Sequence, residues 1–163
     1  MTTSPILRNI SAAFLLAACV CQAQALDNNK QLLSGGNYQV EGATAGGTAT
    51  SYTAPGMARQ YDADTIPPGL GPSIAALRLP EAGVLSKLRV HVVTVSAPAT
   101  GTFTLTVLKN GAPTSLKCSV STSSDCSKNT AVSFSAGDRL SIEVKNTFAN
   151  SGNVAYTYTM LLD

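Results

Sequence analysis

The sequence has no tryptophan, one histidine and few charged residues. Its 163 residues include 11 Lys and Arg and 9 Asp and Glu, so 12% are charged and the net charge is +2. The cations are scattered, whereas nucleic-acid binding requires clustered cations that displace counterions. No nucleic-acid partner is therefore expected. Aromatic residues make up 6%, and Ser, Thr, Gly and Ala are abundant, which favours a β protein over a helical one.

Residues that commonly carry catalysis are also scarce. The single imidazole, His91, falls on the predicted outward face of a strand beside Lys87 and Arg89, and no acidic residue is expected at its register. The chain has neither a Gly-x-Ser-x-Gly elbow nor a Cys-x-x-Cys pair. Its length fits one domain without a second, cofactor-binding domain. We expect no enzymatic activity, no metal and no cofactor.

The first 25 residues have the pattern of a secretory signal peptide. Arg8 precedes an apolar run at residues 10–20, and Ala23 and Ala25 form a small-x-small cleavage site. The run is about half the length of the ~20 residues that a membrane-spanning helix needs. The sequence therefore predicts export.

Residues 16–19, Leu-Ala-Ala-Cys, also resemble the lipobox of bacterial lipoproteins, in which the cysteine becomes the lipidated N-terminus. Lipidation at Cys19 would leave Cys21 without an obvious partner, whereas cleavage at the small-residue site leaves the pair Cys118 and Cys126. Soluble export is favoured, and an outer-membrane lipoprotein held to the membrane through Cys19 is the alternative. Both place the domain outside the cytoplasm, in the periplasm, at the cell surface or in the extracellular space.

Cys118 and Cys126 bracket a Ser-rich stretch of the chain. Exported thiols meet an oxidising environment, so the expectation is a disulfide that staples a hairpin. A loop this short contributes about 2 to 3 kcal/mol in the chain-entropy model.

Alternation of apolar and polar residues predicts several half-buried strands. It is clearest at residues 103–107, 140–145 and 154–160. Residues 84–95 predict a bent or bulged strand with Leu88, Val90 and Val92 inward. Turn signals separate these strands, and the strongest is Asn110-Gly111, because both positions tolerate positive φ. The predicted turns lie at residues 98–101, 110–113, 136–138 and 150–153.

The N-terminal part of the mature chain is less regular. Residues 26–60 are rich in Gly, Ala and Thr and predict one or two weak strands, while residues 61–163 carry the main sandwich. Prolines make residues 62–72 a surface connection. Residues 26–163 are expected to form one folded unit.

Strands linked only by turns can bury their apolar faces only against one another. The sequence therefore predicts an all-β, two-sheet antiparallel sandwich or a small barrel. Jelly-roll topology is favoured over immunoglobulin-like topology, which would have a buried Trp and a widely spaced cysteine pair. The predicted core consists of Ile74, Leu77, Leu79, Leu88, Val90, Val92, Phe103, Leu105, Val107, Val132, Phe134, Leu140, Ile142, Val144, Tyr156, Tyr158 and Met160.

Three segments and the cysteine pair carry a family resemblance. They are residues 82–90 (AGVLSKLRV), residues 109–111 (KNG), Cys118 with Cys126, and residues 134–140 (FSAGDRL). In this arrangement the chain resembles exported bacterial and phage-fibre jelly-roll domains, which are distantly similar to complement and tumour-necrosis-factor type heads. The resemblance covers about residues 82–145, under half of the chain. It implies a jelly-roll fold and assembly as a homo-oligomer, commonly a trimer.

Ligand contacts are expected outside the regular strands. Tyr38, Tyr52 and Tyr61 would form a polar-aromatic patch, with edge packing as the alternative role. Asp62 and Asp64 would add carboxylate oxygens for a glycan. The same two acids, or the loops at Asp125 and Asp138, would supply ligands for calcium, with solvated loop acids as the alternative. Asp138 is expected to cap the turn after Gly137.

Two function classes remain. The first is a non-catalytic exported domain that acts in extracellular or cell-surface assembly or adhesion, with a second copy or a surface or matrix protein as partner. The uncharged outward residues Thr102, Thr104 and Thr106 are consistent with a sheet that meets a neighbour. The alternative is a monomeric module that binds a carbohydrate or another ligand. A hydrolase, which would have to use His91, is the least favoured class.

Overall fold

The computed structural model describes most of the chain beyond the N-terminal segment. The described residues are 30–40, 47–57, 60–67, 70–94, 101–121, 124–148 and 154–163. At 38–40, 65 and 94 only the backbone is described. The predicted signal peptide with Cys19 and the predicted turn at 150–153 therefore lie outside these residues, as does most of the predicted turn at 98–101.

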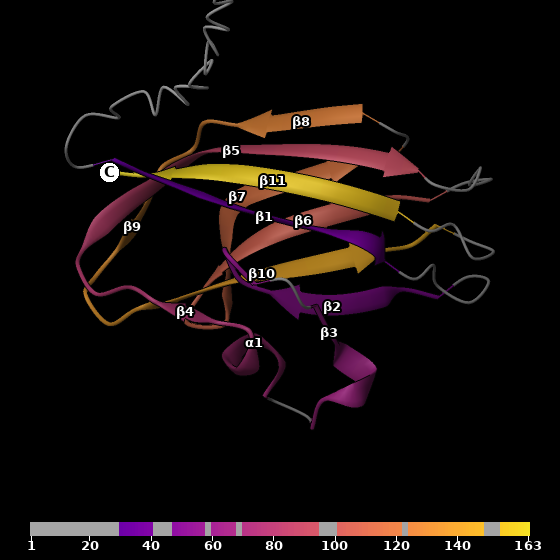
Figure 1. Cartoon of the computed structure of the whole chain (residues 1–163), viewed down its shortest axis with the longest axis horizontal. Coiled ribbons are helices and arrows are strands. Elements are labelled where there is room, and N and C mark those ends of the chain that lie inside the picture. The colour runs from indigo at the N-terminus through magenta and orange to yellow at the C-terminus, as the bar shows by residue number, and fades with distance from the viewer. Residues whose placement is uncertain are drawn as a thin grey trace, which may run out of the picture.

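Two antiparallel sheets pack face to face (Figure 1). Sheet A consists of β1 (Gln31–Val40), β11 (Val154–Leu162), β5 (Gly83–Thr94) and β8 (Ser124–Lys128) in that order, and β9 (Val132–Phe134) also pairs with β5. Sheet B consists of β3 (Tyr61–Asp62), β2 (Ala49–Thr53), β10 (Arg139–Asn146), β6 (Phe103–Lys109) and β7 (Ala112–Val120) in that order, and β4 (Leu77–Arg78) pairs with β10. The predicted all-β, two-sheet antiparallel sandwich is confirmed.

The chain changes sheet at most of its connections. It passes from β1 in sheet A to β2 in sheet B, from β5 to β6, from β7 back to β8, and from β10 to β11. Among the long strands that the structure describes, only β6 and β7 are both consecutive and paired. The packing of the two sheets therefore depends on strands from the whole described chain.

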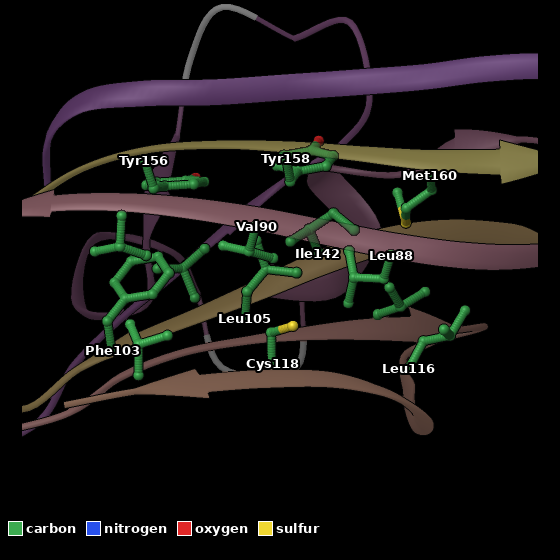
Figure 2. Packing of buried hydrophobic residues seen from close by; sticks show 14 of the residues in the cluster. Leu88, Val90, Phe103, Leu105, Leu116, Cys118, Ile142, Tyr156, Tyr158 and Met160 are labelled. Atoms are coloured by element: carbon green, nitrogen blue, oxygen red, sulfur yellow. The ribbon is translucent and has the colours of Figure 1, made fainter. Parts of the chain in front are cut away.

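The inner faces of the two sheets form the core. Tyr156 of β11 points toward Phe103 of β6, with ring centroids 5.0 Å apart (Figure 2). Leu77 and Val132 are half-buried. The remaining predicted core residues, Ile74 excepted, are buried as the alternation indicates: Leu79, Leu88, Val90, Val92, Phe103, Leu105, Val107, Phe134, Leu140, Ile142, Val144, Tyr156, Tyr158 and Met160.

The long strand β5 contains the predicted bulge. Between the pairs Thr159↔Arg89 and Leu161↔Ser86 it has one residue more than β11. Lys87 lies there with φ 54°, a left-handed conformation that ends one alternation and begins another. Because side chains alternate with period two, this extra residue lets both Leu85 and Leu88 face the core.

The predicted hairpin at Asn110-Gly111 is confirmed. Lys109 pairs with Ala112, which leaves a two-residue loop with φ 53° at Asn110 and 83° at Gly111. Two consecutive positive φ values characterise the type I′ turn, whose twist matches that of paired strands.

The predicted disulfide joins Cys118 to Cys126, with Cα atoms 5.8 Å apart. The expectation that it staples a hairpin is wrong, because β7 and β8 do not pair with each other. Cys118 lies in sheet B and Cys126 in sheet A, so the bond links the two sheets. Most residues of the short strand β8 are exposed, and this link holds the strand at the edge of sheet A.

Ile74 was predicted in the core and is 40% exposed. It ends the short helix α1 (Gly71–Ile74), which has Pro at its start, a position that favours a helical turn over a strand. The predicted surface connection at residues 62–72 also contains a short 3₁₀ helix, η1 (Ala63–Thr65), and the buried Ile66. The alternation with period two therefore begins after Ile74.

Candidate functional site

The outer face of sheet A displays the side chains that alternate with the core residues. On β11 these are Ala155, Thr157 and Thr159, and on β5 they are Arg89, His91 and Val93. The strand pairing places four residues in one row across the sheet: Gly36, Thr157, His91 and Asp125. A second row contains Ser34, Thr159, Arg89 and Ser127.

The side chains of His91 and Asp125 contact each other on this face, between β5 and the edge strand β8. Nδ1 of His91 lies 2.6 Å from Oδ1 of Asp125, and the side chains are 58% and 82% exposed. The expectation that His91 has no acidic partner at its register is wrong, because β5 and β8 pair at these two residues. The contact orients the imidazole and leaves Nε2 for other partners. Because both groups are exposed, solvent screens the pair and it adds little to stability.

A hollow of about 340 Å³ lies over β5, β8 and β11 beside this pair. We call it the polar hollow. Its polar side chains are Arg89, His91, Asp125, Ser127, Thr157 and Thr159.

A second hollow, of about 410 Å³, lies over β1, β11 and β5. We call it the apolar hollow. It shares His91 and Thr157 with the polar hollow, and Gly35, Gly36, Val93 and Ala155 line the rest of it together with Asn37 and Tyr156. Val93 is 44% exposed there. The outer face of sheet A is therefore polar toward β8 and apolar toward β1.

The polar side chains of this face can form hydrogen bonds and charged contacts with a ligand. In the described residues, no Ser or Thr hydroxyl is hydrogen-bonded to the His91 ring. No group of three or more His, Cys, Asp or Glu side chains in the same part of the chain is arranged to hold a metal ion. Covalent catalysis through His91 would need a nucleophile within hydrogen-bond reach of its ring.

The sequence-predicted contacts lie elsewhere. Tyr52 pairs with Tyr61, and Ser51 with Asp62, so Tyr52, Tyr61 and Asp62 meet at the β2–β3 edge of sheet B, and Asp64 follows in η1. Tyr38 lies on β1 in sheet A, and its side chain is outside the described part of the chain. The structure thus brings four of the five predicted residues to one edge and leaves Tyr38 apart.

Tyr52 is engaged in packing. A Cβ on Gly71 of α1 would lie only 2.5 Å from its ring, so the helix approaches the ring closely where a glycine permits it. Burial, followed by the nearby Glu143 carboxylate, raises the pKa of the Tyr52 hydroxyl. The Tyr52 ring therefore serves more as a support for α1 than as an open platform for a sugar.

Asp138 also has a structural role, as its position after Gly137 indicates. Its Oδ2 accepts a hydrogen bond of 2.7 Å from the Ser135 N–H and lies 3.0 Å from Nζ of Lys109. Its Oδ1 accepts a bond of 2.7 Å from the Asn110 amide. The Asn110 amide, then the Ser135 N–H and the Lys109 ammonium, lower the pKa of Asp138 to about 2. These contacts occupy the carboxylate that was considered for calcium.

Comparison with known proteins leaves the chain without an assigned family: no protein family and no curated protein matches it. In the described residues, no helix is long and apolar enough to cross a membrane.

Sequence reasoning missed Arg89, Ser127, Thr157 and Thr159 as site residues. The available signal was the alternation of strands 84–95 and 154–160, which sends these β5 and β11 side chains outward. Ser127 lies on β8, in a segment that lacks the alternation.

Proposed function

We propose that the protein is a non-catalytic, exported domain of jelly-roll topology that assembles with other copies of itself outside the cytoplasm. The topology is supported by strand order: eight long strands divide equally as β1-β11-β5-β8 and β2-β10-β6-β7, with most connections crossing between sheets. An immunoglobulin fold would divide as A-B-E-D and C-F-G, with consecutive strands side by side in both sheets. Export is supported by the signal-peptide pattern, and the disulfide is compatible with it.

The observation that carries the proposal is the apolar hollow on the open outer face of sheet A. The glycine, alanine and threonine residues of this half have no side chain or a small one, so few groups project from it. Val93 adds exposed apolar area. An apolar area beside a polar rim is typical of surfaces that meet a protein partner.

The outer face of sheet B offers a contrast. Ser141 alternates with core residues and so belongs to this outer face, yet it is 1% exposed, and Thr106 is 5% exposed. Helix α1 packs against β10 and β2 on this sheet. Thr106 was expected on an open outward face, so that expectation is wrong. The chain itself covers part of sheet B, which favours sheet A as the contact face.

Light scattering on a sizing column tests the proposal. The purified protein should have two or three times the mass of one chain. Val93→Arg should lower that mass to one chain, because it puts a charge into the apolar hollow. Ser119→Arg, at an exposed position of β7 in sheet B, is the matched control and should leave the mass unchanged. A single-chain mass for the unmodified protein at all accessible concentrations would overturn self-assembly.

The polar hollow favours a second candidate, a monomeric ligand-binding module. Its six converging polar side chains fit a ligand with hydroxyl groups. A single-chain mass together with specific ligand binding would favour this candidate.

A further inference from the structure

We propose that the polar hollow binds a carboxylate-bearing sugar, such as a uronic acid unit of an extracellular polysaccharide. The proposal goes beyond self-assembly and names a ligand class for the second candidate function, at the polar hollow, which shares only His91 and Thr157 with the apolar hollow. It rests on three features of the hollow: the guanidinium of Arg89, the hydroxyl groups beside it and the charges of the lining side chains.

Arg89 supplies the charge. In the described part of the chain its guanidinium forms no ion pair, although it lies on the same face as Asp125. Strand pairing places Thr159 on one side of Arg89 and Ser127 on the other. A guanidinium presents a planar fork of N–H donors that matches a carboxylate, and the two hydroxyls can donate to or accept from neighbouring ring hydroxyls.

The charges that line the hollow favour a ligand with one negative charge over a ligand with two. Oδ1 of Asp125 already contacts Nδ1 of His91 at 2.6 Å, so this oxygen is engaged within the protein. Arg89 remains as the one cation of the hollow without a partner among the described residues. A carboxylate would neutralise it, whereas a phosphate dianion would leave an excess negative charge beside Asp125.

The neutral part of a sugar also has partners. The contact at Nδ1 leaves Nε2 of His91 for a ring hydroxyl, and Thr157 lies opposite His91 in the strand pairing. The volume of about 340 Å³ is within the range of small-molecule sites. Because the hollow is open and Arg89 is exposed, solvent competes for every contact, and we expect millimolar affinity for one sugar unit.

Titration of the isotopically labelled protein with D-glucuronate, followed by amide chemical shifts, tests this site. The expected result is saturable shifts confined to β5, β8 and β11, with no such shifts on addition of D-glucose. Arg89→Gln should weaken glucuronate binding at least about tenfold, which corresponds to 1.4 kcal/mol. Arg139→Gln removes an exposed arginine of sheet B and should bind as the unmodified protein does.

Further arms separate the alternatives. Val93→Arg, as a single chain, should still show saturable glucuronate shifts in β5, β8 and β11, so a failure of self-assembly and a failure of binding are distinguishable. Inorganic phosphate that binds more tightly than glucuronate would overturn the assignment to a carboxylate sugar. Equal shifts with glucose and glucuronate, or unchanged binding by a folded Arg89→Gln protein, would overturn the site itself.

Discussion

Asn110 and Asp138 bind each other across 28 residues of sequence, with Nδ2 of Asn110 donating to Oδ1 of Asp138 at 2.7 Å. Oδ1 of Asn110 accepts the backbone N–H of Arg139 at 2.8 Å. The tip of the β6–β7 hairpin is thereby joined to the turn that precedes β10. Asn110 and Asp138, whose residue types favour the two turns, therefore also form a contact between distant segments of the chain.

This contact makes stability depend on pH in the acid range. Asp138 has its pKa lowered from 3.8 to about 2, chiefly by the Asn110 amide. A lowered carboxyl pKa means that the stabilisation is complete above about pH 4 and is lost as pH falls through about 2. The difference in unfolding temperature between the unmodified protein and Asp138→Asn should therefore be largest above pH 4 and shrink toward pH 2.

Asp64→Asn is the control for this acid effect, since Asp64 is an exposed carboxylate on η1. Its unfolding temperature should follow that of the unmodified protein. A difference for Asp138→Asn that stays constant from pH 2 to pH 6 would contradict the role assigned to the carboxylate.

Loss of the hydroxyl group should change the unfolding free energy differently at the two buried tyrosines of β11. The Tyr156 hydroxyl donates to Oε1 of Gln60 at 3.2 Å, whereas the Tyr158 hydroxyl is buried with no hydrogen-bond partner among the described residues. Tyr156→Phe should cost about 1 kcal/mol, and Tyr158→Phe should be neutral or stabilising. Urea unfolding of the two variants measures this difference, and an equal loss in both would contradict it.

Gly35 is required by its neighbour across the sheet. A Cβ at this position would lie 2.5 Å from the hydroxyl oxygen of Tyr158 and 2.7 Å from its Cζ. Gly35→Ala should therefore destabilise the protein by about 1 to 3 kcal/mol through overpacking. Tyr158→Phe should recover part of this loss in the double variant. Ser34→Ala, at the exposed position beside it, is the control and should have little effect on urea unfolding. An equally small effect of Gly35→Ala would contradict the role given to the close approach.

The disulfide should hold β8 in place. Its loss removes the covalent link between the sheets and about 2 to 3 kcal/mol of stability in the chain-entropy model. Reduction of the unmodified protein by dithiothreitol should lower the unfolding free energy and increase amide exchange in residues 124–128 more than in β11. Uniform exchange across both strands would contradict a local role. Weaker glucuronate binding should accompany the reduction, because Asp125 and Ser127 line the polar hollow from β8.

Local chemistry made much of the fold predictable. Alternation located the strands at 103–107, 140–145 and 154–160, because in each strand apolar residues that face the core alternate with more polar residues on the other face. The Asn110-Gly111 turn was predictable because few residues tolerate two consecutive positive φ values. Counting cysteines found the pair Cys118 and Cys126.

The candidate site was less predictable, because strand pairing between distant segments creates it. Asp125 meets His91 across 34 residues of sequence, and its strand β8 is mostly exposed and lacks apolar alternation. Nothing local indicates which residue of β5 it faces. Ile74 was wrongly predicted in the core, because an apolar residue shortly after Pro72 fits the start of an alternation as well as the end of a helical turn.

Labelling of the sole histidine tests the proposed contact face most directly. His91 is 58% exposed in the single chain and lies between the two hollows, so assembly through this face should protect it. The rate of its modification by diethyl pyrocarbonate should fall as protein concentration rises, and should be independent of concentration in Val93→Arg. An assembled protein in which His91 reacts as fast as in the single chain would contradict the account.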